Sequence, residues 1–141
     1  MKIKYGLSLI TLIALFEKTT HAQVKDCFQD NVLSRLTFVV QLGELSKAVG
    51  KFGANVKHLE AKLKKKIRIV EFDPDKLVFI RHMVLPLQIQ GIEEIEEGRV
   101  VITGNDTQTK GLIIGRNAAN LRNLENNCRR YFPEIKEIRV V

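Results

Sequence analysis

Residues 48–65 read Ala-Val-Gly-Lys-Phe-Gly-Ala-Asn-Val-Lys-His-Leu-Glu-Ala-Lys-Leu-Lys-Lys. Gly50 and Gly53 bracket Lys51 and Phe52, and apolar residues at helical spacing follow. Glycine has no Cβ, so it lets the backbone turn sharply and lets another molecule approach closely. The following helix offers unpaired N–H groups and the positive end of its dipole, and Lys51 adds a positive charge. The stretch therefore predicts a phosphate-binding loop between two helices.

The second half of the chain repeats this pattern. Residues 113–131 read Ile-Ile-Gly-Arg-Asn-Ala-Ala-Asn-Leu-Arg-Asn-Leu-Glu-Asn-Asn-Cys-Arg-Arg-Tyr. Gly115 aligns with Gly50 and Arg116 with Lys51, but Ala118 stands where the first copy has glycine. The aligned pairs further along are Ala54 with Ala119, Asn55 with Asn120, Val56 with Leu121, Lys57 with Arg122, Leu59 with Leu124 and Glu60 with Glu125. An internal repeat is stronger evidence than either copy alone.

The composition describes a basic chain of 141 residues with a formal net charge of +7. A basic balance favours polyanionic partners such as nucleic acid or an anionic membrane. The repeat predicts two modules of roughly seventy residues, residues 1–72 and 73–141. Modules of this size have thin cores and are expected to lean on one another.

No pattern in the sequence indicates catalysis or a metal site. His21, His58 and His82 are scattered, there is no C-x-x-C spacing, and no Ser-His-Asp set or carboxylate pair stands out. Cys128 lies on the apolar face of its helix and is expected to be a reduced core residue, while a disulfide with Cys27 stays open. The sequence predicts neither an enzyme nor a bound cofactor.

The N-terminal residues fit two descriptions. Lys2 and Lys4 precede an apolar run over residues 7–16, and Ala22 follows, which is the outline of a secretory signal peptide. The run is too short to span a bilayer. Its apolar residues also recur at helical spacing, and the repeat favours this alternative, a buried first helix, because the second half also begins with a helix.

The periodicities predict the same order of elements in both halves: helix, strand, strand, short helix, loop, long helix, strand. Residues 36–42 alternate as a strand with Leu36 and Phe38 on one face and Thr37 and Val39 on the other. Asp73 and Pro74 are expected to start the first helix of the second half. The remaining expected elements are 23–29, 44–49, 66–72, 87–92, 99–103, 107–114, 119–131 and 135–141.

Two helix–loop–helix modules of this order, joined with almost no linker, resemble the pair of KH domains in the transcription factor NusA. The resemblance rests on residues 48–56, 69–74 and 113–121, and it covers nearly the whole chain. The chain is similar to the short archaeal NusA-like proteins, which contain little more than this pair. The resemblance implies an α+β fold of two tandem prokaryotic-type (type II) KH domains, residues 1–72 and 73–141.

The same resemblance implies a cytoplasmic protein that binds single-stranded RNA in transcription elongation, termination or antitermination. RNA polymerase is a further implied partner, with no membrane and no small-molecule substrate. KH loops clamp about four nucleotides, so one strand would run across both loops. The implied RNA-binding residues are Gly50, Lys51, Phe52, Gly53, Lys57, Gly115, Arg116, Asn117, Ala118 and Arg122. The expected groove residues are Val49, Val56, Ile67, Ile69, Ile114, Leu121 and Ile138.

Several of these residues also have plainer interpretations. Val56 and Leu121 fit a hydrophobic core better than a groove, and Phe52 fits either stacking on a base or propping its loop. If the position of Ala118 requires a positive φ, alanine costs on the order of 1 kcal/mol there, and the second module would bind more weakly. The charged residues that fit a merely solvated face are Lys57, Lys64, Lys65, Lys66, Arg129 and Arg130. Residues 93–97 are expected to form a solvated hairpin that faces away from RNA.

Two other functions compete with RNA binding. One is a protein adaptor of KH fold that docks on RNA polymerase or the ribosome without strong RNA binding, which Ala118 favours for the second half. The other is a secreted or membrane-associated basic protein, which depends only on residues 2–16.

Overall fold

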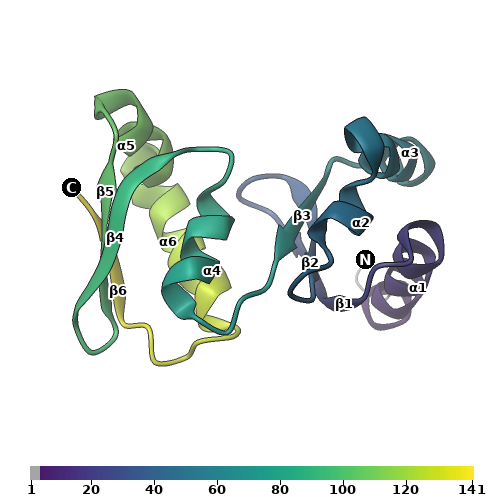
Figure 1. The fold of residues 1–141 in the computed structure, drawn as a ribbon, viewed down its shortest axis with the longest axis horizontal. Coiled ribbons are helices and arrows are strands. Elements are labelled where there is room, and N and C mark those ends of the chain that lie inside the picture. Colours follow the sequence, from purple (N-terminus) through teal and green to yellow (C-terminus); the bar gives the residue numbers. More distant parts are fainter. Residues whose placement is uncertain (1–3) are drawn as a thin grey trace. The chain divides into compact units, whose positions relative to one another are not determined.

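The computed structural model describes residues 4–141, with side chains from Leu9 onward. The chain divides into two compact units, Met1–Phe72 and Asp73–Val141. Each unit contains one three-stranded sheet and three helices, in the order α-β-β-α-α-β (Figure 1). A single 3-10 turn separates the last two helices of each unit. The fold is therefore α+β, as the sequence predicts.

The first unit is built on a sheet whose central strand is β2. Strand β1 pairs with it antiparallel and β3 pairs with it parallel. The elements of this unit are α1 (Lys4–Thr20), β1 (Val24–Asp30), β2 (Arg35–Val40), α2 (Leu45–Val49), α3 (Ala54–Leu63) and β3 (Ile67–Glu71).

Helix α1 supplies part of the hydrophobic core of the first unit. Phe16 is completely buried, and its ring stacks on that of Phe38 with 4.3 Å between centroids. Leu12 and Ile13 pack against the same core, and Ala22 is buried just beyond the helix. The N-terminal apolar run therefore forms the packed first helix that the repeat favours, while Lys2 lies outside the described residues.

The alternation expected along 36–42 is only partly present. Strand β2 ends at Val40, and its residues Leu36–Val40 are all buried, so Thr37 and Val39 do not form an exposed face. Strand β2 is central, with a neighbour on each edge, and its side chains on both faces are buried. Leu42 lies beyond the strand and is 57% exposed, so it does not share the core face.

The second unit repeats this plan around a sheet with β5 at its centre. Strand β4 pairs with β5 antiparallel and β6 pairs with it parallel, and the three helices lie on one face of the sheet (Figure 1). The elements are α4 (Lys76–Val84), β4 (Ile89–Glu96), β5 (Arg99–Gly104), α5 (Thr107–Ile114), α6 (Ala119–Arg129) and β6 (Glu137–Val140). Phe79 anchors the core, with the rings of Tyr131 and Phe132 at 5.3 and 5.8 Å.

The start of α4 differs from the prediction that Asp73 caps it. The N-cap is Asp75, whose carboxylate accepts the Leu77 N–H at 2.9 Å. Asp73 instead accepts the Asp75 N–H at 2.8 Å, so its side chain shapes the turn that leads into the helix. Asp73 and Asp75 are equally good N-cap residues by type, and the turn between them places Asp75 at the N-cap of α4.

The acidic hairpin at residues 93–97 makes more contacts than a solvated hairpin would. Strand β4 continues to Glu96, and the Glu94 carboxylate accepts the Gly98 N–H at 2.7 Å. Glu94 also pairs with Lys76 at 2.8 Å, and this contact joins the start of α4 to the hairpin. Glu94 is thus a structural residue rather than a merely solvated one.

No helix within residues 4–141 combines the length and the apolar character that crossing a membrane requires.

Candidate nucleic-acid interface

The two glycine loops have the same backbone conformation. Gly50 and Gly115 end α2 and α5 with φ/ψ of 78°/172° and 76°/175°. Each is followed by one 3-10 turn, Lys51–Gly53 or Arg116–Ala118. In each turn the N–H of the fourth loop residue donates to the carbonyl of the first at 3.2 Å. The sequence repeat is therefore a repeat of one local structure.

An asparagine at the second position of each long helix explains why the first glycine is required. The Asn55 Nδ2 donates to the Lys47 carbonyl at 3.1 Å, and the Asn120 Nδ2 donates to the Leu112 carbonyl at 3.1 Å. These side chains tie each long helix to the short helix before it and pass directly beside the glycine. A Cβ at Gly50 would lie 2.9 Å from Asn55 Cγ. The sequence repeat includes both asparagines, but it does not show that they link the two helices, because only their hydrogen bonds to the preceding helix show that role.

The last loop position behaves differently from the first. Gly53 has φ of 72°, and a Cβ placed there would meet no atom within 4 Å. Ala118 adopts nearly the same conformation, with φ of 60° and ψ of 21°. The position therefore does require a positive φ, and the second loop tolerates alanine at the cost of a strained residue.

Phe52 stands at the tip of the first loop and faces solvent. Its side chain is 88% exposed, so it does not prop the loop against its own helix. Its φ of 53° is unusual for a bulky residue, whereas Asn117 at the matching position, with φ of 56°, belongs to a type that tolerates this region. An exposed aromatic ring held in a strained conformation is a feature that clusters at functional sites.

The cations of the two loops are arranged unequally. Lys51 and Arg116 are exposed at matching positions, and Lys57 is exposed one turn into α3. Arg122, the counterpart of Lys57, donates to Glu125 Oε1 at 2.6 Å. Glu125 is 3% exposed and the Arg122 side chain is 57% exposed, so the predicted binding residue Arg122 is paired with a carboxylate through one end of its guanidinium group. The sequence reveals the charge but not this pairing.

The expected groove residues separate into two groups. Val49, Val56 and Ile114 are half-buried beside the loops, as an apolar groove wall requires. Ile69 is also half-buried. Leu121, Ile67 and Ile138 are instead buried in the cores, at 6%, 6% and 0% exposure. Leu121 therefore takes its core interpretation, and the groove-floor prediction was wrong for Ile67 and Ile138. The first turn of α6 and the starts of β3 and β6 are already covered by their own units.

The helix that leads into the second loop is capped by an acidic side chain. Asp106 accepts the Thr109 N–H at 2.7 Å at the start of α5. This backbone hydrogen bond is the main cause that holds the pKa of Asp106 below its ordinary value. The cap fixes the direction of α5 and, through it, the position of Gly115.

Comparison with known proteins shows relatives along nearly the whole chain. A protein of Methanococcus vannielii, named probable transcription termination protein NusA, is 32% identical over 143 residues, covering 100% of this chain and 81% of its own. Proteins of the same name from Methanocaldococcus jannaschii and Halobacterium salinarum are 28% and 30% identical, over 99% and 94% of this chain and 76% and 94% of their own. The chain belongs to this archaeal NusA family.

A solved structure supports the same relationship at the level of the fold. The structure described as "Crystal structure of APE1850" superposes with a TM-score of 0.74 at 25% identity. The match covers 96% of this NusA-family chain and 99% of the other. No protein-family model matches the chain.

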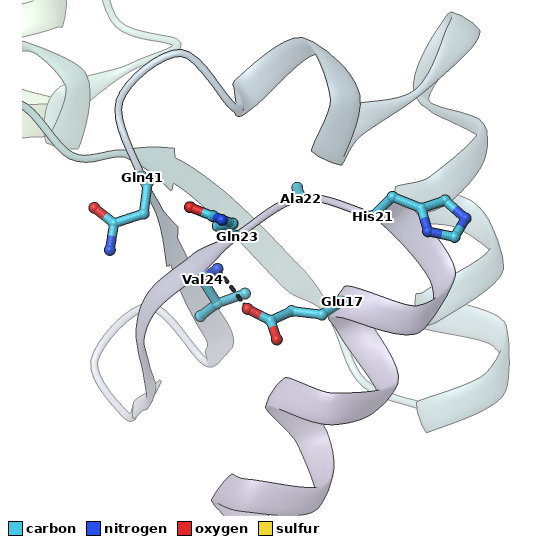
Figure 2. Close-up of a pocket in the computed structure, with 6 residues that line it drawn as sticks. All are labelled: Glu17, His21, Ala22, Gln23, Val24 and Gln41. Atoms are coloured by element: carbon cyan, nitrogen blue, oxygen red, sulfur yellow. Dashed lines mark hydrogen bonds between the residues drawn. The ribbon is translucent and has the colours of Figure 1, made fainter.

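One hollow lies away from the loops of this NusA-family protein. Figure 2 shows it at the end of α1, lined by Glu17, His21, Ala22, Gln23, Val24 and Gln41. The Glu17 carboxylate accepts a hydrogen bond from the Val24 N–H at 2.9 Å, and the His21 ring points away from that carboxylate. The described residues contain no group of three side chains able to hold a metal ion. Cys27 and Cys128 are not joined by a disulfide, and each is buried in its own unit.

Proposed function

We propose that this NusA-family chain binds single-stranded RNA through its two glycine loops and acts in transcription elongation, termination or antitermination. Each unit is then a KH domain of the prokaryotic type (type II), with boundaries at 1–72 and 73–141. RNA polymerase in the cytoplasm is the proposed second partner. The observation that carries the proposal is the duplicated loop, in which two different sequences adopt one conformation.

The open side of the first loop suits an RNA backbone. Nothing lies within 4 Å of the place where a Gly53 Cβ would be, so a sugar–phosphate chain can approach the main chain there. The N–H groups of Gly50 and Gly53 are bonded within the loop and helix, at 3.0 and 3.2 Å. The amides of Lys51 and Phe52 are therefore the proposed backbone donors to phosphate, beside the Lys51 ammonium group.

Phe52 is proposed to stack on a base that leaves the loop. Stacking on an exposed aromatic ring is tolerant of base identity and contributes about 1–3 kcal/mol per base. Asn117 at the same point of the second loop offers hydrogen bonds but no stacking surface. The two loops would then hold the strand by different means.

A second candidate function applies to the second unit, as a surface that docks on another protein such as RNA polymerase or the ribosome. It is favoured by the pairing of Arg122 with Glu125, which partly offsets the positive charge beside the second loop. The methyl group of Ala118 also occupies the space that Gly53 leaves open in the first loop.

The test is binding of a ladder of short single-stranded RNAs to the full chain and to a Lys51→Asp/Phe52→Asp variant. Both side chains are exposed, so the fold should be retained, which circular dichroism checks. The control is Lys18→Asp, an exposed lysine on α1. We expect affinity to rise with length to roughly eight nucleotides and to fall in the loop variant only. Weak, length-independent binding by the wild type would reject RNA binding and leave a protein partner.

A further inference from the structure

The net positive charge of the chain is confined to one of its two units. Residues 1–72 contain 13 Lys and Arg against 6 Asp and Glu, whereas residues 73–141 contain 10 of each. The whole formal net charge of +7 therefore belongs to the first unit. Lys51, the basic residue of the first loop, contributes only a small part of this net charge.

Much of this charge gathers at the far end of α3. We define the lysine cluster as Lys62, Lys64, Lys65 and Lys66 with Arg35, all of them exposed. The fold brings the two segments together, because the Leu36 N–H donates to the Lys66 carbonyl at 2.9 Å. Lys65 Nζ donates to Gln29 Oε1 at 3.3 Å, so strand β1 lies beside the cluster as well.

The carboxylates near the lysine cluster accept hydrogen bonds from backbone N–H groups and do not pair with its lysines. Glu60 accepts the Ile67 N–H at 3.0 Å, and Asp30, which is 3% exposed, accepts the N–H groups of Val32 and Leu33. Across the described part of the chain, none of the four lysines forms a salt bridge. The lysine cluster is therefore a concentrated charge without an internal counter-ion.

The backbone at Lys64 adds an independent observation. Lys64 ends α3 in the left-handed conformation, with φ of 55°, at the position where helices usually carry glycine. Glycine adopts this conformation freely and lysine does not. A lysine kept at a strained helix end, within a run of lysines, points to a use for its charge.

The second unit uses its matching cation for structure instead. Arg129 near the end of α6 donates to the carbonyls of Ile135 and Lys136 at 2.9 and 2.6 Å. The residue that ends α6, Arg130, has φ of −57°, without the left-handed conformation. The basic helix end is thus a property of the first unit and not of the repeated fold.

We propose that the lysine cluster is a second phosphate-binding site that receives the RNA backbone after it leaves the first loop. Helix α3 has 10 residues, so at about 1.5 Å per residue the cluster lies ~15 Å from the loop. A basic surface that follows the backbone is the usual partner of a single strand. This inference depends on the proposed function, because the loop must hold the strand that the cluster receives.

The test measures RNA affinity against salt for the full chain, a Lys64→Gln/Lys65→Gln variant and a Lys18→Gln/Lys136→Gln control of equal charge. Each lost phosphate contact reduces the log–log salt slope by about 0.7. We expect the log–log salt slope of the cluster variant to be smaller than that of the wild type by about 1.4. The ratio of wild-type affinity to variant affinity should therefore fall about sevenfold between about 50 and about 200 mM salt. The control should keep the wild-type slope, and the loss should be equal for all RNA sequences.

Lys64→Gly separates binding from folding. Glycine suits the left-handed helix end, so we expect stability to be retained or raised while the slope falls by about 0.7. If the wild type binds RNA and the Lys51→Asp/Phe52→Asp variant does not, but the cluster variant matches its control, the lysine cluster is only a solvated surface. If the wild type itself shows no length-dependent binding, the proposed function fails and the cluster site fails with it.

Discussion

Ala118 differs from its counterpart in the first loop by the strain of its backbone. It holds φ of 60° where the first loop has Gly53 at 72°. Ala118→Gly should raise the free energy of unfolding by up to about 1 kcal/mol by removing this strain, partly offset by the greater freedom of glycine in the unfolded chain. Urea denaturation of the full chain, followed by circular dichroism, measures the change.

Gly53→Ala is the matched control, and it should shift stability in the opposite direction. A methyl group at Gly53 meets no atom within 4 Å, so any loss comes from backbone conformation alone. Equal stability of wild type and Gly53→Ala would show that the left-handed conformation costs nothing in these loops.

Residue types and spacing were enough to locate both loops, but not to rank the residues within them. The need for a positive φ at Ala118 depends on a backbone that no single residue reveals. The contacts of Asn55 and Asn120 with the preceding helices also lie outside any local pattern, although the repeat contained both residues. The pairing of Arg122 with Glu125 was hidden because a charge on a helix carries no sign of its partner.

At the scale of elements, one carboxylate in each unit joins the long helix to the last strand. Glu125 accepts the Ile138 N–H at 2.7 Å in a buried site, and Glu60 accepts the Ile67 N–H at 3.0 Å in a half-buried one. Glu125→Ala should cost about 1–3 kcal/mol, because it leaves a buried N–H without a partner. Glu60→Ala should cost less, since water can reach that site.

Thermal and urea unfolding of these two variants, with Glu97→Ala as an exposed control, test this ranking. Glu97 lies in the turn between β4 and β5 and should change stability little. A larger loss in Glu60→Ala than in Glu125→Ala would contradict the ranking by burial.

Lys76 makes the stability of the second unit depend on pH at both extremes. Its hydrogen bond with Glu94 raises the pKa of Lys76 above 10.5 and lowers the pKa of Glu94 below 4.5. The contribution of Glu94 is present above pH 4.5 and is lost as pH falls through its folded value, and that of Lys76 is present below pH 10.5 and is lost as pH rises. The stability difference between wild type and Lys76→Gln should therefore be constant near neutral pH and shrink beyond both limits.

Urea titrations of both proteins at several pH values measure that difference, and Lys136→Gln, at an exposed lysine of the second unit, serves as a control. A difference that stays the same down to pH values well below 4.5 would mean that the Lys76–Glu94 contact does not contribute.

Most element types follow from periodicity, while their ends depend on contacts. Residues 107–114 were predicted as a helix and are one, with Asp106 as its cap. The start of α4 was misplaced because Asp73 and Asp75 are equally good caps in sequence, and only the turn distinguishes them. The strand expected at residues 36–42 ends at Val40. Both of its alternating sets of side chains are buried in the central strand β2, which the alternation alone does not show.

At the scale of the whole molecule, duplication of the fold has not preserved equal charge. The order of elements and the loop conformation are the same in both units, yet the formal charge of +7 lies entirely in the first. The sequence could predict the tandem architecture because a repeat survives the exchange of individual residues. It could not show which charges are neutralised, since the carboxylates that do so come from other turns and strands.

This asymmetry predicts that the two loops contribute unequally to RNA binding. Lys51→Glu and Arg116→Glu change the net charge by the same amount at matching exposed positions. Loss of a charge-assisted hydrogen bond costs about 1.5–3 kcal/mol, so Lys51→Glu should weaken binding roughly tenfold or more. Arg116→Glu should have a much smaller effect, because the second unit adds no net positive field and Arg122 is held by Glu125. Fluorescence anisotropy with one labelled RNA at a fixed salt concentration compares the two, and an equal or larger loss for Arg116→Glu would show that both loops bind the strand alike.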